Sequence, residues 1–299
     1  MRSVFKCILS KIIGIAVPTL IALCFSCGLL SGEIDEAMRE ELGGPVTVVT
    51  ADQSVFTGVL KAVASDSLIL VESAGAGSVE YTLSFADIST IELPGRHYVN
   101  EAMKLIEAEN FTEAITVLNA LYQQRVALLR WQSPAVLGYF KLYAQLLVDH
   151  GSLVAAIRVA ESLKPYVRDI RMLHELEDVT LIAYYRLSMP EAADLATKWI
   201  AERQRYDYSA LGYYVQAALK LQSGEIDQAL HAALEPIVFS SQFPMMYLDF
   251  CYAIAIKAAF DLKQPRHARY LWQEMQERGL PWPKQWSAER ASIEQVVDQ

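Results

Sequence analysis

The stretch KLYAQLLVDHGSLVAAIRVA (residues 141–160) decides the fold of this chain. Ala144 and Ala156 lie twelve residues apart in it, and Gly151 comes five residues before the second alanine. Two antiparallel helices joined by a short turn can approach closely only where their side chains are small, and glycine suits the turn. The stretch therefore predicts a helical hairpin in which one alanine from each helix lies at the crossing point.

The same arrangement recurs along the chain. Ala217 and Ala229 are again twelve residues apart, with Gly224 five residues before the second, and Ala102 and Ala114 have the same spacing. Repetition at a fixed period is the signature of a repeat architecture. The sequence thus predicts about five helical pairs between residues 95 and 280, whose second-helix alanines are Ala114, Ala156, Ala192, Ala229 and Ala268.

These units resemble tetratricopeptide (TPR) repeats, although their spacing of 36 to 42 residues exceeds the standard 34. The resemblance implies a TPR-like helical-hairpin solenoid over residues 95–280 that binds a protein or peptide and catalyses no reaction. Pro281-Trp282-Pro283 ends the array. Within residues 281–299 we expect a polar C-terminal helix that caps the last apolar face, as solenoids require.

In the TPR family the first helix of each pair lines a concave surface. On this chain the resemblance implies a peptide-binding surface that is aromatic with a few cations. Aromatic rings beside Lys141 and Lys257 would suit an extended peptide with apolar and acidic side chains. The alternative is that the rings are ordinary packing between repeats. The implied binding residues are Lys141, Gln145, His174, Tyr184, Tyr214, Leu221, Phe250, Lys257 and Phe260.

Ahead of the helices, residues 33–94 follow a different pattern. Five short runs rich in β-branched residues are separated by turn-forming residues, which predicts five short strands. Gly58 falls in the second run, where a sharply bent strand needs no side chain. A closed barrel would leave no exposed edges, so we expect a small barrel. The predicted fold class is α+β, with a five-stranded small β-barrel followed by an all-α TPR-like solenoid.

This stretch also resembles an Sm-like small barrel. The matching residues are Val46-x-Val48, Gly58-x-Leu60, Leu68-x-Leu70 and Ile88-x-x-Ile91. The family's RNA-binding loop has an asparagine after the third-strand aspartate, whereas Ser67 follows Asp66 here. We therefore expect a structural or protein-contact module, with an RNA-binding module as a disfavoured alternative.

The N-terminal residues 1–32 have the form of an export signal. Arg2, Lys6 and Lys11 are followed by residues 12–30, which carry no charge. We expect an extracytoplasmic protein of the bacterial periplasm or cell envelope. Three fates of the segment stay open: cleavage as a signal peptide, retention as a signal anchor that associates with the membrane, and lipidation at Cys27, whose surroundings resemble a lipoprotein box.

Charge and motifs restrict the function further. The net charge of −9 is the wrong sign for binding a phosphate backbone, so nucleic acid is not an expected partner. The sequence has no phosphate loop, nucleophile elbow or paired-histidine metal motif, so we expect no enzyme, cofactor or metal site. The sequence therefore predicts an exported scaffold or adaptor that binds an envelope protein or peptide. The alternatives are a membrane-tethered lipoprotein that assists envelope assembly and a cell-wall glycan enzyme or accessory subunit, whose carboxylates would be drawn from Glu175, Glu177 and Asp178.

Overall fold

The computed structural model describes residues 36–75, 77–203, 208–239, 245–287 and 290. The chain divides into two compact units, residues 1–132 and 133–299. The predicted export signal, Cys27 and most of the predicted capping helix lie outside the described residues. Within the described part, none of the helices has the length and apolar character needed to cross a bilayer.

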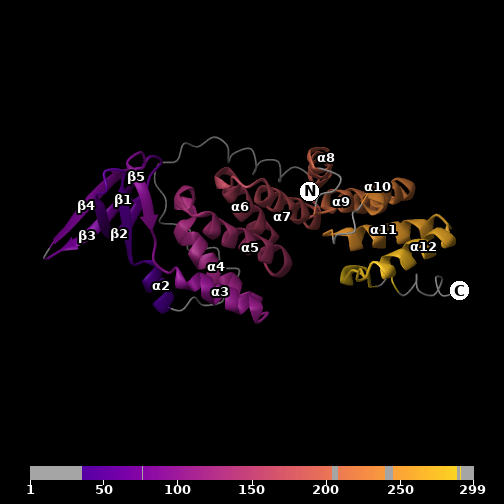
Figure 1. Cartoon of the computed structure of the whole chain (residues 1–299), viewed down its shortest axis with the longest axis horizontal. Coiled ribbons are helices and arrows are strands. Elements are labelled where there is room, and N and C mark those ends of the chain that lie inside the picture. The colour runs from indigo at the N-terminus through magenta and orange to yellow at the C-terminus, as the bar shows by residue number, and fades with distance from the viewer. Residues whose placement is uncertain (1–35, 76, 204–207, 240–244, 288–289, 291–299) are drawn as a thin grey trace, which may run out of the picture. The chain divides into compact units, whose positions relative to one another are not determined.

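The first unit contains a short helix and an antiparallel sheet (Figure 1). The five predicted strands are confirmed, and their order in the sheet is β4-β3-β2-β1-β5. Strands β1 to β4 pair in succession as hairpins, and β5 returns to pair with β1. The elements are α2 (Glu36–Leu42), β1 (Pro45–Thr50), β2 (Val55–Val63), β3 (Ser67–Ala74), β4 (Gly77–Ser84) and β5 (Ile88–Glu92).

The prediction of a closed barrel was wrong. β4 and β5 lie at opposite edges of an open sheet. The sheet covers its apolar face with another element instead of closing on itself: Leu128 and Trp131 of the 3-10 helix η1 (Val126–Trp131) pack against its core. Because this packing removes the apolar face from water, closure of the sheet is not required to bury it.

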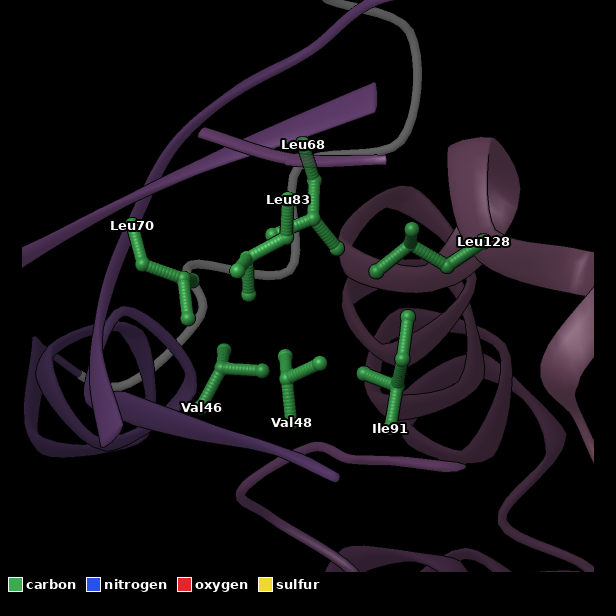
Figure 2. Packing of buried hydrophobic residues seen from close by; sticks show 7 residues of the cluster. All are labelled: Val46, Val48, Leu68, Leu70, Leu83, Ile91 and Leu128. Atoms are coloured by element: carbon green, nitrogen blue, oxygen red, sulfur yellow. The ribbon is translucent and has the colours of Figure 1, made fainter. Parts of the chain in front are cut away.

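Buried and exposed side chains alternate along the strands, and the buried ones form that core. Val46 and Val48 of β1, Leu68 and Leu70 of β3, and Leu83 of β4 are buried, while most residues between them are more exposed. This period of two places alternate side chains on one face. Figure 2 shows the side chains converging on one interior together with Ile91 and Leu128.

Gly58 lies where the backbones of β2 and β3 approach closely. It is a buried position of β2, and a Cβ atom there would lie 2.7 Å from the carbonyl oxygen of Val71. That contact is with backbone, which has little freedom to move away. The glycine expected from the sequence to serve a bend thus serves a close backbone approach.

The first helical pair belongs to the same compact unit as the sheet. It consists of α3 (His97–Glu107) and α4 (Phe111–Arg125). Arg125 is buried and donates from Nη2 to the carbonyl oxygen of Pro94 at 2.9 Å. Gln124 donates from Nε2 to the carbonyl oxygen of Leu42 at 2.6 Å. The end of α4 is therefore bonded to the segments on either side of the sheet.

The second unit contains four further helical pairs, which with α3 and α4 give the five predicted pairs (Figure 1). The alanines predicted to lie at the crossings are buried: Ala144, Ala156, Ala217 and Ala229 have no exposed surface. First helices of successive pairs also contact one another. The helices are α5 (Pro134–His150), α6 (Leu153–Leu163), α7 (Ile170–Arg186), α8 (Ala192–Glu202), α9 (Leu211–Gln222), α10 (Ile226–Phe239), α11 (Leu248–Asp261) and α12 (Pro265–Glu277), with the short 3-10 helices η2 (Lys164–Tyr166) and η3 (Lys284–Trp286).

The close approach at Gly58 gives a test of the sheet. We expect Gly58→Ala to lower the free energy of unfolding of the full chain by about 1–3 kcal/mol, because the added methyl group overpacks against backbone. Gly77→Ala is the matched control, since a Cβ atom there would meet only the carbonyl oxygen of Ala74 at 3.9 Å. Denaturant unfolding followed by circular dichroism measures both; equal stability of the two variants would contradict the close approach.

Candidate functional site

The first helices of the pairs in the second unit carry the residues predicted to bind a peptide. We call α5, α7, α9 and α11 the inner helices, because each contacts the next in this order. Tyr214 is buried, with 2% of its surface exposed. The other predicted residues are half-buried: Lys141, Gln145, His174, Tyr184, Leu221, Phe250, Lys257 and Phe260.

Four aromatic rings meet on α7, on α9 and at the N-terminal end of α11. Tyr214 on α9 lies at the centre, and its ring centroid is 4.8 Å from that of Phe250, 5.6 Å from Tyr185 and 6.0 Å from Tyr247. Tyr185, Tyr247 and Phe250 are half-buried. We call these four residues the aromatic cluster. The structure thus brings Tyr214 and Phe250 together, and it adds Tyr185 and Tyr247, which the sequence analysis missed.

Tyr247 holds an unusual backbone conformation. Its φ of 64° lies in the left-handed region, where a residue with a bulky side chain is strained, and it precedes the first residue of α11. Its ring stacks on Tyr214 with an interplanar angle of 8°. Burial raises the pKa of both phenol groups, so the two rings are uncharged at neutral pH. The surrounding structure therefore holds Tyr247, whose ring is uncharged, in a backbone conformation that is unfavourable for tyrosine.

Three cations on the inner helices have partners within the chain. Lys141 forms an ion pair with Glu175 of α7, and Lys257 forms one with Asp261, four residues along α11. Arg186 donates from Nη1 to the carbonyl oxygen of Val148 at 2.8 Å. Opposite charges that pair within the chain attract an outside charge less strongly. The aromatic rings, more than the lysines, are therefore the distinctive chemistry of the inner helices.

A buried carboxylate lies on the third turn of α7. Asp178 accepts hydrogen bonds from Nε1 of Trp199 at 2.7 Å and from the hydroxyl of Tyr208 at 3.3 Å. Nη2 of Arg203 lies 3.4 Å from its Oδ1 and 3.0 Å from Oε2 of Glu177. We call Glu177, Asp178, Trp199, Arg203 and Tyr208 the Asp178 cluster. It joins α7 to the end of α8 and to the segment that leads into α9.

Burial raises the pKa of Asp178 from 3.8 to about 6, because the charged carboxylate has lost its water. The hydrogen bonds from Trp199, Ser209 and Tyr208 and the charge of Arg203 oppose this effect without cancelling it. A carboxylate with such a pKa changes its charge close to neutrality.

A pair of backbone hydrogen bonds extends the Asp178 cluster towards the aromatic cluster. The amide of Met246 donates to the carbonyl oxygen of Tyr208, and the amide of Ala210 donates to the carbonyl oxygen of Met246, both at 2.8 Å. Met246 directly precedes the strained Tyr247. The segment that Asp178 holds is therefore bonded to the segment that sets the position of Tyr247.

The carboxylates considered for a glycan enzyme all have partners. Glu175 pairs with Lys141, Glu177 with Arg203, and Asp178 with the donors described above. Among the described residues, no group of three or more His, Cys, Asp or Glu side chains could hold a metal ion. The sequence marked these carboxylates as a dense acidic run, but Trp199 and Arg203, more than twenty residues further on, carried no signal that they would face it.

Neither the family models nor the curated proteins include a match to this chain. The solved structures similar to it include the following two. The crystal structure of MamA protein has 16% sequence identity and a TM-score of 0.42, and the match covers 64% of this chain and 92% of that one. The complex of the TPR2AB domain of yeast Sti1 with pHSP90 has 17% identity and a TM-score of 0.26, and the match covers 68% of this chain and 85% of that one.

Both TM-scores lie below 0.5. At these scores the likeness carries no conclusion about the function of this chain.

The Asp178 cluster can be tested through Trp199. We expect Trp199→Phe to lower the free energy of unfolding by about 1–3 kcal/mol at pH 8, because it removes a donor from a buried ionised carboxylate. Trp272→Phe is the control: Trp272 is a half-buried ring on α12 that contacts Trp282, and its loss should cost about 1 kcal/mol or less. Urea unfolding of both variants measures the difference, and a larger loss in Trp272→Phe would contradict the role given to Trp199.

Proposed function

We propose that the chain is a non-enzymatic scaffold that binds a protein or peptide partner through the aromatic cluster on its inner helices. The observation that carries the proposal is the grouping of three half-buried rings, Tyr185, Tyr247 and Phe250, around the buried Tyr214. Aromatic side chains dominate the energetics of protein interfaces because they bury a large area with little loss of side-chain freedom.

The ion pairs define the chemistry of the expected partner. Lys141 and Lys257 are neutralised by Glu175 and Asp261, so they do not favour an acidic segment strongly. We therefore propose that the partner contributes apolar or aromatic side chains as its main anchors. The residues implied by the TPR resemblance, from Lys141 to Phe260, then form the wider surface around these anchors.

The sheet of the first unit has a separate proposed role. We propose that it is a protein-contact module and not an RNA-binding one, despite its resemblance to Sm-like proteins. The acidic net charge of −9 and the serine after Asp66 support this proposal.

Peptide selection tests the binding proposal. The full chain is used to select peptides from a displayed library, and the affinity of a selected peptide is then measured by fluorescence anisotropy. We expect Phe250→Ala to weaken binding about tenfold to a hundredfold, the effect of losing an anchor residue of an interface.

Tyr270→Ala is the control for this experiment, because Tyr270 lies on α12 and is 62% exposed. It should leave the affinity unchanged. Circular dichroism confirms that both variants are folded. Failure to select any peptide, or loss of binding in Tyr270→Ala but not in Phe250→Ala, would overturn the proposed function.

We also propose that the protein is exported to the periplasm or cell envelope by residues 1–32. The charge pattern of that segment supports export, and the mass of the protein purified from its own cells distinguishes the possible fates. We expect a mass that corresponds to cleavage, to lipidation at Cys27, or to a full-length chain that stays in the membrane as a signal anchor. A soluble, full-length chain in the cytoplasm would contradict export, and loss of membrane association in Cys27→Ser would identify lipidation.

A further inference from the structure

The outer edge of β4 is unpaired among the residues that the structure describes. β4 lies at one end of the strand order, and its strand partner there is β3 (Figure 1). The two strands keep one register over eight residue pairs, from Ser67 with Ser84 to Ala74 with Gly77, without a bulge. The edge is therefore uninterrupted over the length of β4, as the addition of a further strand requires.

The backbone of β4 offers hydrogen-bonding groups along this edge. The amide of Phe85 donates to the carbonyl oxygen of Asp66 at 2.8 Å, which sets the phase of the β3–β4 ladder. Since only alternate residues of an antiparallel strand bond to one neighbour, the others turn their amide and carbonyl groups to the free edge. These residues are Ser78, Glu80 and Thr82. None of the three has another backbone hydrogen bond to a described residue.

β4 lacks the features by which proteins usually protect a sheet edge, such as proline, lysine, a bulge or a very short strand. Its eight residues include no proline or lysine, and its one charged residue, Glu80, forms an ion pair with Lys61. The opposite edge is protected: β5 has five residues, its register with β1 shifts at Val49 and Thr50, and Pro94 follows it closely. This difference indicates that β4, and not β5, is the edge kept accessible for pairing.

The two faces of β4 determine which side chains an added strand should carry. On the core face, the half-buried Tyr81 has its ring centroid 5.2 Å from that of Phe56, and Val79 is 42% exposed. Apolar side chains at alternate positions of an added strand would lie beside these residues and extend the core. The opposite face carries the exposed side chains of the residues with free backbone groups, so polar side chains of the added strand fit there.

The charge of the sheet favours a basic segment. Residues 45–92 contain six acidic residues and one basic residue, Lys61, and all seven are described. Glu72 lies on β3 beside β4, and Asp66 and Asp87 flank the other end of β4. These three carboxylates are exposed, and none forms an ion pair with a described cation. Because their negative charge is not compensated locally, it attracts a positively charged partner.

We propose that the edge of β4 binds an extended segment of a partner protein, in which apolar and basic residues alternate, as a further strand of the sheet. Main-chain hydrogen bonds to Ser78, Glu80 and Thr82 supply affinity, and the side chains on the two faces select the sequence. This inference deepens the proposed protein-contact role of the sheet and rests on it. It does not depend on the aromatic cluster.

Thr82→Pro tests the edge while sparing the β3–β4 ladder. The amide of Thr82 faces away from β3, so proline removes a donor that only an added strand uses, and proline is tolerated at such edge positions. Thr82→Ala is the matched control because it keeps the amide. Circular dichroism establishes that both variants are folded.

The probe is a synthetic peptide of the length of β4 in which valine alternates with lysine, and fluorescence anisotropy measures its affinity for the full chain. We expect Thr82→Pro to bind this peptide about tenfold more weakly than Thr82→Ala, because a hydrogen bond is lost and the proline ring obstructs the approaching strand. A peptide in which valine alternates with glutamate should bind the wild type at least about tenfold more weakly, because the sheet repels it.

Hydrogen exchange locates the peptide on the wild-type protein. With the valine–lysine peptide bound, the amides of Ser78, Glu80 and Thr82 should exchange more slowly, whereas the amide of Tyr81, which already bonds to β3, should change little. Because this measurement needs no variant, it decides the question even if Thr82→Pro does not fold. Protection elsewhere on the sheet, with none at these three amides, overturns the edge inference and leaves the sheet a protein-contact module.

Four other results overturn the proposal. They are failure of the wild type to bind the valine–lysine peptide, equal binding by Thr82→Pro and Thr82→Ala, equal or tighter binding of the valine–glutamate peptide, and self-association of the wild type that Thr82→Pro abolishes. The last result, measured by analytical ultracentrifugation, would assign the edge to a second copy of the chain. A peptide whose binding is weakened by Phe250→Ala should bind Thr82→Pro as tightly as the wild type, which separates this edge from the aromatic cluster.

Discussion

The close approach of paired helices at small buried side chains is the constraint on which the helical part of this structure depends. Ala144 and Ala156 illustrate it, since both are completely buried where α5 meets α6. A larger side chain at such a crossing would force the helices apart and open the packing around it. The inner helices contact one another in order along the chain, and the aromatic cluster forms where three of them meet.

Much of this architecture is predictable from the sequence because it depends on local patterns. The alternation of Val46 and Val48 with exposed neighbours predicts a strand, and the spacing of Ala217, Gly224 and Ala229 predicts a hairpin. Whether the sheet closes into a barrel or stays open was not predictable from local patterns. Whether an apolar face closes on itself or is covered depends on Leu128, which lies well beyond the last strand and packs on the sheet only in the folded chain.

The same distinction holds for the candidate site: residues placed by a local pattern were predictable, and residues placed by contacts distant in sequence were not. Tyr214 and Phe250 were found because their positions within the repeat are fixed by the register, but Tyr247 lies outside the helical period, in a left-handed conformation that no sequence pattern announces for tyrosine. Asp178 was visible as part of an acidic run. Its partners Trp199, Arg203 and Tyr208 come from a different helix and its following segment, so their contacts with Asp178 required the structure.

Together these features describe a helical array in which small side chains set the spacing, a buried carboxylate holds one connecting segment, and aromatic rings gather on the inner helices. The central claim is that those rings contact a partner. A photo-crosslinking residue placed at Phe250 in the full chain, expressed in its own cells, tests it most directly. We expect a discrete crosslinked product from position 250 and none from the exposed control position Tyr270. Crosslinking from position 270 alone, or from neither position, would contradict contact between the rings and a partner.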